Sequence, residues 1–158
     1  MPRAKVKREV VVKDALDAFN RADFNNGIFA VGVLDDKVSY DDGTRVVDVA
    51  TWNEFGTANI PARPALRSAI LSVAPQLQKL GRKQAKLMLF RKLRMDKAVR
   101  DQAKIMQKEM RDSIESWDRP PNAPSTVAQK GFDDPLIDTG LYKDSIEFKA
   151  IVTRKDQL

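Results

Sequence analysis

The sequence predicts an α+β fold, in which a small antiparallel sheet packs against an N-terminal helix and a central pair of long helices. Two short apolar segments rich in β-branched residues, 28–34 and 146–153, lie far apart in the chain and are typical of strands. Between them, residues 76–90 and 96–116 repeat apolar side chains every three or four positions, which predicts amphipathic helices. Because strands and helices fall into separate runs, we expect helices on one face of the sheet, and we expect the last strand to join the sheet begun by residues 28–40.

The N-terminal third is predicted to begin with a helix over 9–24, because its apolar residues recur at helical spacing. Gly27 follows two Asn residues and suits a left-handed cap at the end of that helix. After the apolar strand, an Asp-Asp turn leads to a predicted half-buried strand at 37–40. Residues 45–55 predict a third strand that passes into a short helix, which Gly56 ends with a positive φ.

The helical middle is predicted to start at Pro64, because proline is well suited to the first position of a helix. A helix over 65–74 follows, and Pro75 is expected to interrupt or restart it. Asp96 is expected to cap the last of these helices. That helix carries one continuous apolar stripe, which we interpret as core, made of Val99, Ala103, Met106, Met110 and Ile114.

The C-terminal part is predicted to open with an extended Pro-rich loop at 119–124. One helical turn at 125–129, a short helix at 141–145 and the final strand complete the chain. We expect a single domain over 1–158, divided into a basic arm at 1–9, a helix with strands at 10–62, a helical middle at 63–116, and a loop, helix and strand at 117–158.

The composition narrows the chemistry, because the 158 residues include no Cys and no His. Disulfides, zinc sites built from Cys and His, and Ser-His-Asp or Cys-His nucleophile systems are therefore excluded. No apolar run approaches the ~20 residues of a membrane span. The apolar segment after the basic N-terminus is too short for a signal peptide. We expect a protein that is not an enzyme, binds no cofactor or metal, and has no membrane partner.

Charge is unevenly distributed along the chain, whose formal net charge is +6. Residues 79–111 carry twelve basic and three acidic side chains, between two flanks of net charge −3 each. A basic block on an ordered helix favours a surface that meets nucleic acid or an acidic protein, although a solvated helix is the alternative interpretation. We expect the DNA-facing or partner-facing side chains to be Lys79, Arg82, Lys83, Lys86, Arg91, Lys92, Arg94, Lys97 and Arg100.

Three short segments of the sequence, which we call phrases, indicate a class of protein more specifically than the composition does. The first phrase, residues 53–67, reads N-E-F-G-T and then I-P-A-R-P-A-L-R. The second phrase, residues 117–126, reads W-D-R-P-P-N-A-P-S-T. The third phrase, residues 130–146, contains K-G, then P-L-I-D-T-G-L, and ends in S-I.

In this order and spacing, the phrases resemble those of small neck and tail-completion proteins of tailed bacteriophages, namely the HK97-type tail components and the Mu-type virion morphogenesis proteins. The resemblance covers residues 46–150. The chain departs from the pattern at Ala65, where an aromatic residue is usual, and at 122–124, where Leu-Ser-Pro is usual. The residues that match the family signature are Glu54, Phe55, Gly56, Thr57, Arg63, Pro64, Trp117, Pro124, Asp138, Thr139, Gly140 and Ser145.

Physical chemistry gives the signature residues mainly structural roles. Arg63 or Arg67 is expected to pair with Glu54 across the turn. Asp138 or Thr139 is expected to cap the short helix at 141–145, since its side-chain oxygen can accept a free backbone N–H. A binding role for these residues is the alternative interpretation.

The resemblance implies a structural virion protein at the head–tail junction, in the neck or at the head-proximal end of the tail. It would form a homo-oligomeric ring that joins connector and tail around the DNA passage. Its implied partners are other copies of itself, connector or neck proteins, tail-terminator or tail-tube proteins, and passing genomic DNA. Assembly would take place in the cytoplasm of the host bacterium.

Two other functions remain as alternatives. The basic stretch also suits a DNA-binding protein that acts outside the virion without sequence specificity, because only one aromatic residue, Phe90, lies within it to stack on bases. The chain has three adjacent aspartate pairs, 35–36, 41–42 and 133–134, and one such pair together with Glu54 is the alternative site for a Mg²⁺-dependent nuclease. Adjacent strand residues point to opposite faces, so these pairs suit turns better than one metal site.

Overall fold

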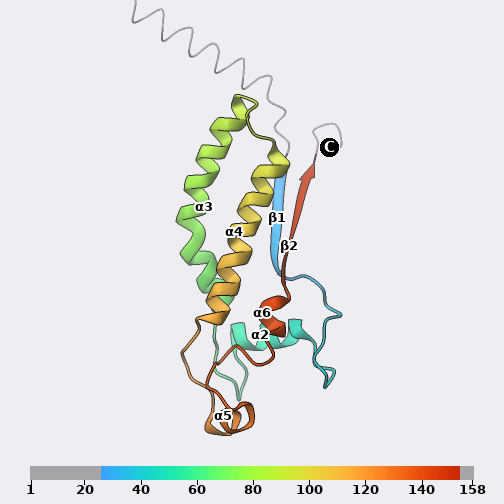
Figure 1. The fold of residues 1–158 in the computed structure, drawn as a ribbon, viewed down its shortest axis with the longest axis vertical. Coiled ribbons are helices and arrows are strands. Elements are labelled where there is room, and N and C mark those ends of the chain that lie inside the picture. The colour runs from blue at the N-terminus through green and yellow to red at the C-terminus, as the bar shows by residue number, and fades with distance from the viewer. Residues whose placement is uncertain (1–25, 154–158) are drawn as a thin grey trace, which may run out of the picture.

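The computed structural model describes residues 26–153 (Figure 1). The basic arm at 1–9 and the helix predicted over 9–24 lie outside the described residues. The predicted α+β class is confirmed, since a two-stranded antiparallel sheet is combined with several helices. The elements are β1 (Asn26–Val33), α2 (Val46–Phe55), α3 (Ala65–Leu89), α4 (Met95–Glu115), α5 (Pro124–Lys130), α6 (Leu141–Asp144) and β2 (Ile146–Thr153).

The sheet pairs the two strands that are furthest apart in the described chain. β1 and β2 are antiparallel, with a register that runs from Asn26 opposite Thr153 to Val33 opposite Ile146. The first and last predicted strands are therefore confirmed, and the last strand joins the sheet through the first. Period-two alternation turns Val33 and Ile146 toward the core and leaves Ile28 and Ile151 exposed on the outer face.

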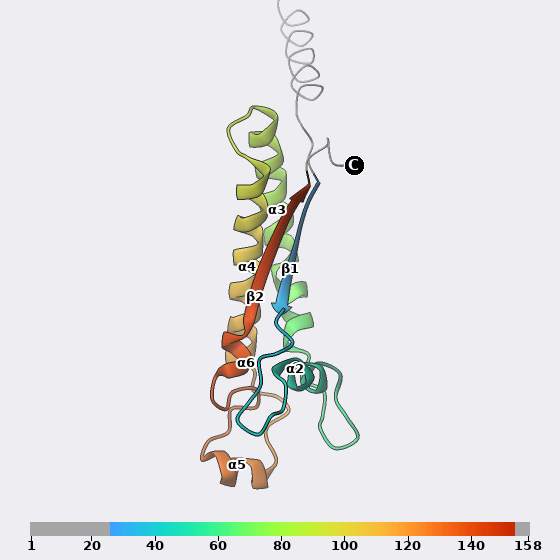
Figure 2. The same ribbon diagram turned by 90° about the vertical axis from the view of Figure 1, so that its right-hand side faces the viewer.

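The helices form an antiparallel hairpin that supports the sheet. α4 packs against both strands and α3 packs against α4. Figures 1 and 2 show that the hairpin and the sheet run along the long axis, while α2, α5 and α6 lie together at one end. In the described part of the chain, no helix combines the length and the apolar character needed to cross a bilayer.

The core lies where α2 and the start of β2 meet one end of the hairpin, formed by the first half of α3 and the second half of α4. Ile114, Ile146, Val46 and Val73 are its largest fully buried side chains. The stripe predicted on α4 is largely confirmed as core, since all five of its residues are buried. The buried cluster comprises Val46, Ala50, Ala65, Ala69, Val73, Met106, Met110, Ile114, Leu136, Tyr142 and Ile146.

The predicted interruption at Pro75 is wrong, because α3 is one continuous helix with Pro75 inside it. Proline removes the hydrogen bond to the carbonyl four residues earlier, which belongs to Leu71. The Leu71 side chain is 71% exposed, so that carbonyl lies on the solvent side of the helix, where water can bind it. Burial of Ala69 and Val73 against α4 holds the two halves of α3 in line.

The second and third predicted strands are also wrong. Residues 37–40 contribute only an isolated bridge, from Ser39 to Arg45. The segment expected to be the third strand is already helical, because α2 starts at Val46. Val46 and Ala50 are one helical turn apart and both are buried, so their packing outweighs the strand preference of the valine-rich segment.

The predicted helix starts need small corrections. Pro64 is the residue before the first turn of α3 rather than its first helical residue. Asp96 is not the cap of α4, which begins after Arg94. Instead, Asp96 lies in the first turn of α4, where its carboxylate is 3.0 Å from Nε of Arg94 and where the helix dipole favours negative charge. The turn predicted at 125–129 is confirmed as part of α5.

Gly27 is a residue of β1 rather than a helix cap, and it lies where the strand passes closest to α4. A Cβ atom there would be 2.4 Å from Cγ2 of Val99. We therefore expect Gly27→Val to lower the free energy of unfolding by about 2 kcal/mol, because the strand must move away from the helix. Urea unfolding measures the change. Ala30→Val, at an exposed position of the same strand, is the control and should change stability little. Equal losses in the two variants would contradict the close approach.

Candidate functional site

The three phrases are brought together at the end of the molecule that holds α2, α5 and α6 (Figure 1). We call this region the phrase end, made of residues 45–67 and 117–145. The turn between α3 and α4 lies at the opposite end of the long axis. We call the exposed basic residues 79–100 near that turn the basic end.

Glu54 joins α2 to the start of α3. Its carboxylate accepts hydrogen bonds of 3.1 Å from the backbone N–H groups of Leu66 and Arg67, two donors that the helix itself cannot satisfy. Nε of Arg67 is 3.5 Å from the same carboxylate, and its guanidinium lies 5.5 Å from the centre of the Phe55 ring. Of the two pairings expected for Glu54, the structure therefore has the one with Arg67.

Arg63 instead joins the first phrase to the second. Although charged, it is only 7% exposed. Its guanidinium donates hydrogen bonds of 3.0 Å to the carbonyls of Pro120 and Pro121, and approaches Oδ1 of Asn122 at 3.5 Å. Burial lowers the pKa of Arg63, and the charge of Asp133 opposes that shift. Arg63 thus holds a loop segment, residues 117–122, whose N–H groups make no backbone–backbone hydrogen bond to any described residue.

A tight turn between α2 and α3 sets the position of Arg63. Thr57 Oγ1 accepts a 3.0 Å hydrogen bond from the N–H of Ile60, and the N–H of Thr57 bonds the Ile60 carbonyl at 2.8 Å. The N–H of Arg63 then bonds the Asn53 carbonyl at 2.6 Å. Gly56 opens this turn with φ 76° and ψ 171°, a conformation almost restricted to glycine.

Replacing Gly56 with alanine should cost about 2 kcal/mol of stability. The new Cβ would have an unfavourable backbone conformation and would lie 3.0 Å from the backbone nitrogen of Ala62. Gly131→Ala is the control, because Gly131 also has a positive φ, 81°, but has the left-handed helical ψ of 0° and no described atom within 4 Å of the added Cβ. The difference between the two thermal denaturation midpoints reports the extra cost at Gly56, from its contact and its ψ of 171° together. A Gly56 variant no less stable than the Gly131 variant would refute it.

The third phrase forms a capped turn that leads into β2. Gly140, with φ 85°, precedes α6, and Thr139 Oγ1 accepts a 3.3 Å hydrogen bond from the N–H of Leu141. Ser145 ends the helix by donating its hydroxyl to the Leu141 carbonyl at 2.7 Å. Of the two expected caps, Thr139 therefore bonds the helix start, whereas no hydrogen bond from Asp138 to it is found among the described residues.

A pocket of about 520 Å³ opens between α2 and the third phrase. Its lining combines apolar residues such as Val49 and Leu136 with three aspartates, Asp41, Asp42 and Asp138. Burial first, and then the charges of Asp138 and Asp42, raise the pKa of Tyr40, so its hydroxyl stays protonated. The residues that line it are Tyr40, Asp41, Asp42, Thr44, Val49, Trp52, Asn53, Lys130, Pro135, Leu136, Ile137, Asp138 and Thr139.

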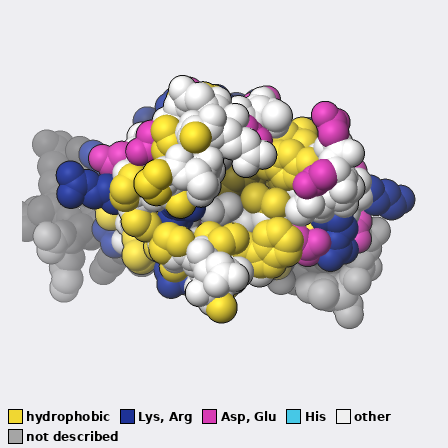
Figure 3. Space-filling model, turned by 90° about the horizontal axis from the view of Figure 1, so that it is seen from below, with side chains coloured by type: hydrophobic (Ala, Val, Ile, Leu, Met, Phe, Trp, Pro, Cys, Tyr) yellow, Lys and Arg dark blue, Asp and Glu magenta, His cyan; other side chains and the backbone are white. Residues whose placement is uncertain are grey.

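The phrase end exposes more apolar surface than its turn-rich sequence suggests. Figure 3 shows hydrophobic side chains over much of this end, with charged groups mainly toward the margins. The exposed fractions are 69% for Phe55, 41% for Trp52 and 39% for Phe132. Trp117 is half-buried against the core, and Pro124 begins α5. Large exposed aromatic side chains on a rigid support are typical of surfaces that bind other proteins.

The basic end divides into two parts with different ion pairing. α3 has no acidic residue, and Lys79, Arg82, Lys83 and Lys86 recur at helical spacing on one exposed face. Among the described residues, none of these four has an ion pair. On α4, Arg94 pairs with Asp96, and Lys97 pairs with Asp101 at 2.8 Å. The remaining members of the expected set, Arg91, Lys92 and Arg100, are exposed at the turn and on α4.

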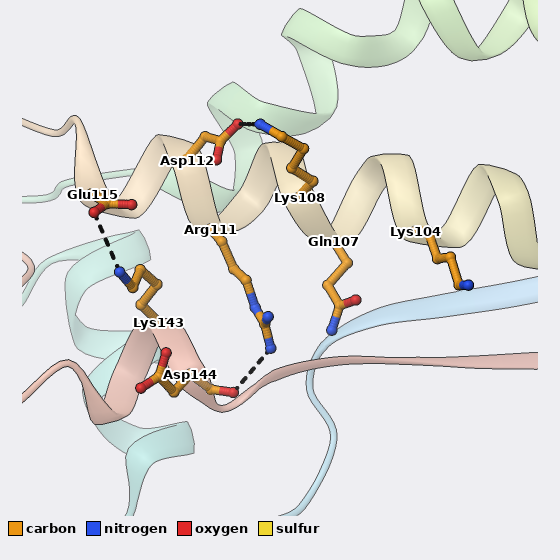
Figure 4. Close-up of a pocket in the computed structure, with 8 residues that line it drawn as sticks. All are labelled: Lys104, Gln107, Lys108, Arg111, Asp112, Glu115, Lys143 and Asp144. Atoms are coloured by element: carbon orange, nitrogen blue, oxygen red, sulfur yellow. Dashed lines mark hydrogen bonds and ion pairs between the residues drawn. The ribbon is translucent and has the colours of Figure 1, made fainter.

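A second pocket, of about 330 Å³, lies between α4 and α6 (Figure 4). Arg111 donates to the carbonyls of Asp144 and Ile146 at 3.2 and 2.8 Å, and Gln107 donates to the Ile146 carbonyl at 2.8 Å. Ion pairs join Lys143 to Glu115 at 3.4 Å and Lys108 to Asp112. These side chains form ion pairs with one another and hydrogen bonds with the backbone, so they hold the start of β2 against α4.

The sequence analysis missed several residues that hold the phrase end together. Ser113 donates its hydroxyl to the Ala65 carbonyl at 2.8 Å, and Asp133 accepts the N–H of Asn122 at 2.9 Å. Lys130 bonds the carbonyls of Asp134 and Ile137. No short sequence pattern predicts these contacts, because each partner lies in another element or across a loop. Among the described residues, no group of three or more acidic side chains is arranged to hold a metal ion.

No family model, curated protein or solved structure was found to match the chain.

Proposed function

We propose that this chain is a structural protein of a tailed bacteriophage particle, located at the neck or at the head-proximal end of the tail. Copies of the chain would form a ring around the DNA passage and join the connector to the tail. The phrase end would contact the neighbouring protein ring, and the basic end would face DNA or an acidic partner.

The observation that carries this proposal is the separation of two unlike surfaces at opposite ends of an elongated molecule (Figure 1). The basic end presents cations on α3 that have no ion pair among residues 26–153, and such cations suit phosphates or carboxylates. The phrase end presents aromatic side chains on α2 and on the loop after α5, and the turn fixed by Glu54, Gly56 and Arg63 follows α2 directly. A subunit with two such surfaces can bind different partners at its two ends, as a joining protein must.

The resemblance of the three phrases to neck and tail-completion proteins supports the same proposal. The first and second phrases contact one another across the helical hairpin, since Arg63 bonds Pro120 and Pro121, which lie 57 and 58 positions further along the chain. The first and second phrases therefore act as one structural unit.

The native mass of the purified protein tests the proposal. One chain has a mass of 17.8 kDa, so a ring appears in light scattering as an integral multiple of that value. We expect ring-shaped particles by electron microscopy, either alone or on addition of purified connector protein. A protein that stays at 17.8 kDa and binds no connector would overturn the proposed function.

The second candidate function, DNA binding outside the virion without sequence specificity, depends on the same cations of α3. It would be favoured if the monomer shifted duplex DNA in a salt-dependent manner while forming no ring and binding no connector.

A further inference from the structure

The sheet keeps both of its long edges unpaired within the described residues. β1 and β2 pair with each other over eight residues each, and no backbone hydrogen bond links either strand to another described element. In an antiparallel ladder, alternate residues direct their N–H and C=O groups away from the partner strand. Each strand therefore presents a row of donors and acceptors along its outer edge.

β1 lacks the features that usually protect an edge strand. Its sequence, NGIFAVGV, contains no charged residue and no proline. A two-stranded sheet is also marginally stable by itself. On its outer face, Ile28 is 66% exposed and its cross-strand partner Ile151 is 50% exposed. A strand of this kind is suited to pairing with another strand, rather than with a helix or with DNA.

We propose that the free edge of β1 in one copy pairs with the free edge of β2 in the next copy, so that one continuous antiparallel sheet runs through the assembly. This inference rests on the proposed ring, because it assumes that copies of the chain meet head to tail. The contact would repeat the cross-strand neighbours found within one chain, with Ile28 beside Ile151 and Val31 beside Phe148. Pairing β1 with β1 would close a two-fold dimer and leave both β2 edges open, so it cannot build a ring.

The spacing of the layers is compatible with this arrangement. Two strands occupy about 10 Å across a sheet, and packed helices lie about 8–10 Å apart. Each copy places one helix, α4, on its two strands, so successive copies of α4 fit side by side at the spacing of the sheet. The Ile146 carbonyl already accepts Gln107 and Arg111, so the contact between copies uses β2 after that residue.

Single-cysteine variants test the contact, because the chain contains no Cys. I28C and I151C replace exposed side chains and leave one thiol per copy, so a disulfide can join only different copies. The two variants are mixed before assembly and oxidised. We expect a disulfide-linked dimer in the mixture, at about tenfold or more the yield of either variant alone, since paired Cβ atoms lie about 5 Å apart, whereas equivalent residues of successive copies lie about 10 Å apart, too far for a disulfide. L71C mixed with I151C is the control and should give no dimer.

The outcomes separate the strand contact from the ring itself. If I28C alone crosslinks as well as the mixture, β1 meets β1 and the proposal is overturned. If light scattering shows a ring but the mixture gives no dimer, the strand contact is wrong and the ring stands. If the protein stays at the mass of one chain, the proposed ring fails and the strand contact fails with it.

Discussion

Arg63→Ala should lower the free energy of unfolding by about 3 kcal/mol, because it removes a buried guanidinium and leaves two part-buried carbonyls without their charged donor. The two carbonyls at stake belong to Pro120 and Pro121, in a loop that cannot rearrange into regular structure. The substitution also leaves a cavity where the guanidinium was, since Arg63 is only 7% exposed. The urea midpoint measures the loss, and limited proteolysis near residue 120 should become faster.

Arg119→Ala is the matched control, because Arg119 belongs to the same loop but is exposed. We expect it to change stability by less than about 0.5 kcal/mol. Arg63→Lys should fall between the two variants, since an ammonium keeps the charge but cannot bond several acceptors in the planar geometry of a guanidinium. If Arg63→Ala were as stable as Arg119→Ala, the first and second phrases would not depend on this contact.

The sequence predicted the parts of the fold in which local pattern and tertiary packing agree. The stripe on α4 and the alternation in β2 each bury one face of a single element, so their apolar periodicity was sufficient. The segment that starts at Val46 was predicted wrongly because its valines favour strands, whereas their burial against α3 and α6 favours a helix. Pro75 was misjudged because the cost of proline depends on whether the freed carbonyl is exposed, which a sequence does not reveal.

The candidate site, like the fold, could be predicted from the sequence only where a residue's role depends on its neighbours in the chain. Turn and cap chemistry at Gly56 and Thr139 could be inferred, since each role depends on neighbouring residues. The role of Arg63 could not, because its acceptors lie 57 and 58 positions away along the chain. The basic stretch could be recognised from the composition of residues 79–111. The sequence did not reveal that its cations form ion pairs near the start of α4 but none on α3 among the described residues, because this depends on which side chains meet carboxylates.

The cations of α3, which have no ion pair within the described part of the chain, should produce non-specific binding to duplex DNA that weakens steeply with salt. Replacing Lys79, Lys83 and Lys86 together with glutamine removes three phosphate contacts, because all three share one exposed face. The slope of log affinity against log salt should then become shallower by about 2.7. Between 50 and 200 mM salt, that difference corresponds to about a 40-fold change in affinity. Fluorescence anisotropy with a labelled duplex at several salt concentrations measures it.

A control with the same loss of charge distinguishes a DNA-binding face from a general effect of net charge. Lys37, Arg119 and Lys149 are exposed and lie outside the basic end, so their joint replacement by glutamine lowers the net charge equally. If contact with phosphates is local to α3, this control keeps the original slope. Equal changes of slope in both variants would show that the whole surface attracts DNA. If the unmodified protein bound no DNA at low salt, the face would instead serve an acidic protein ring, since unpaired cations on an ordered helix suit carboxylates as well as phosphates.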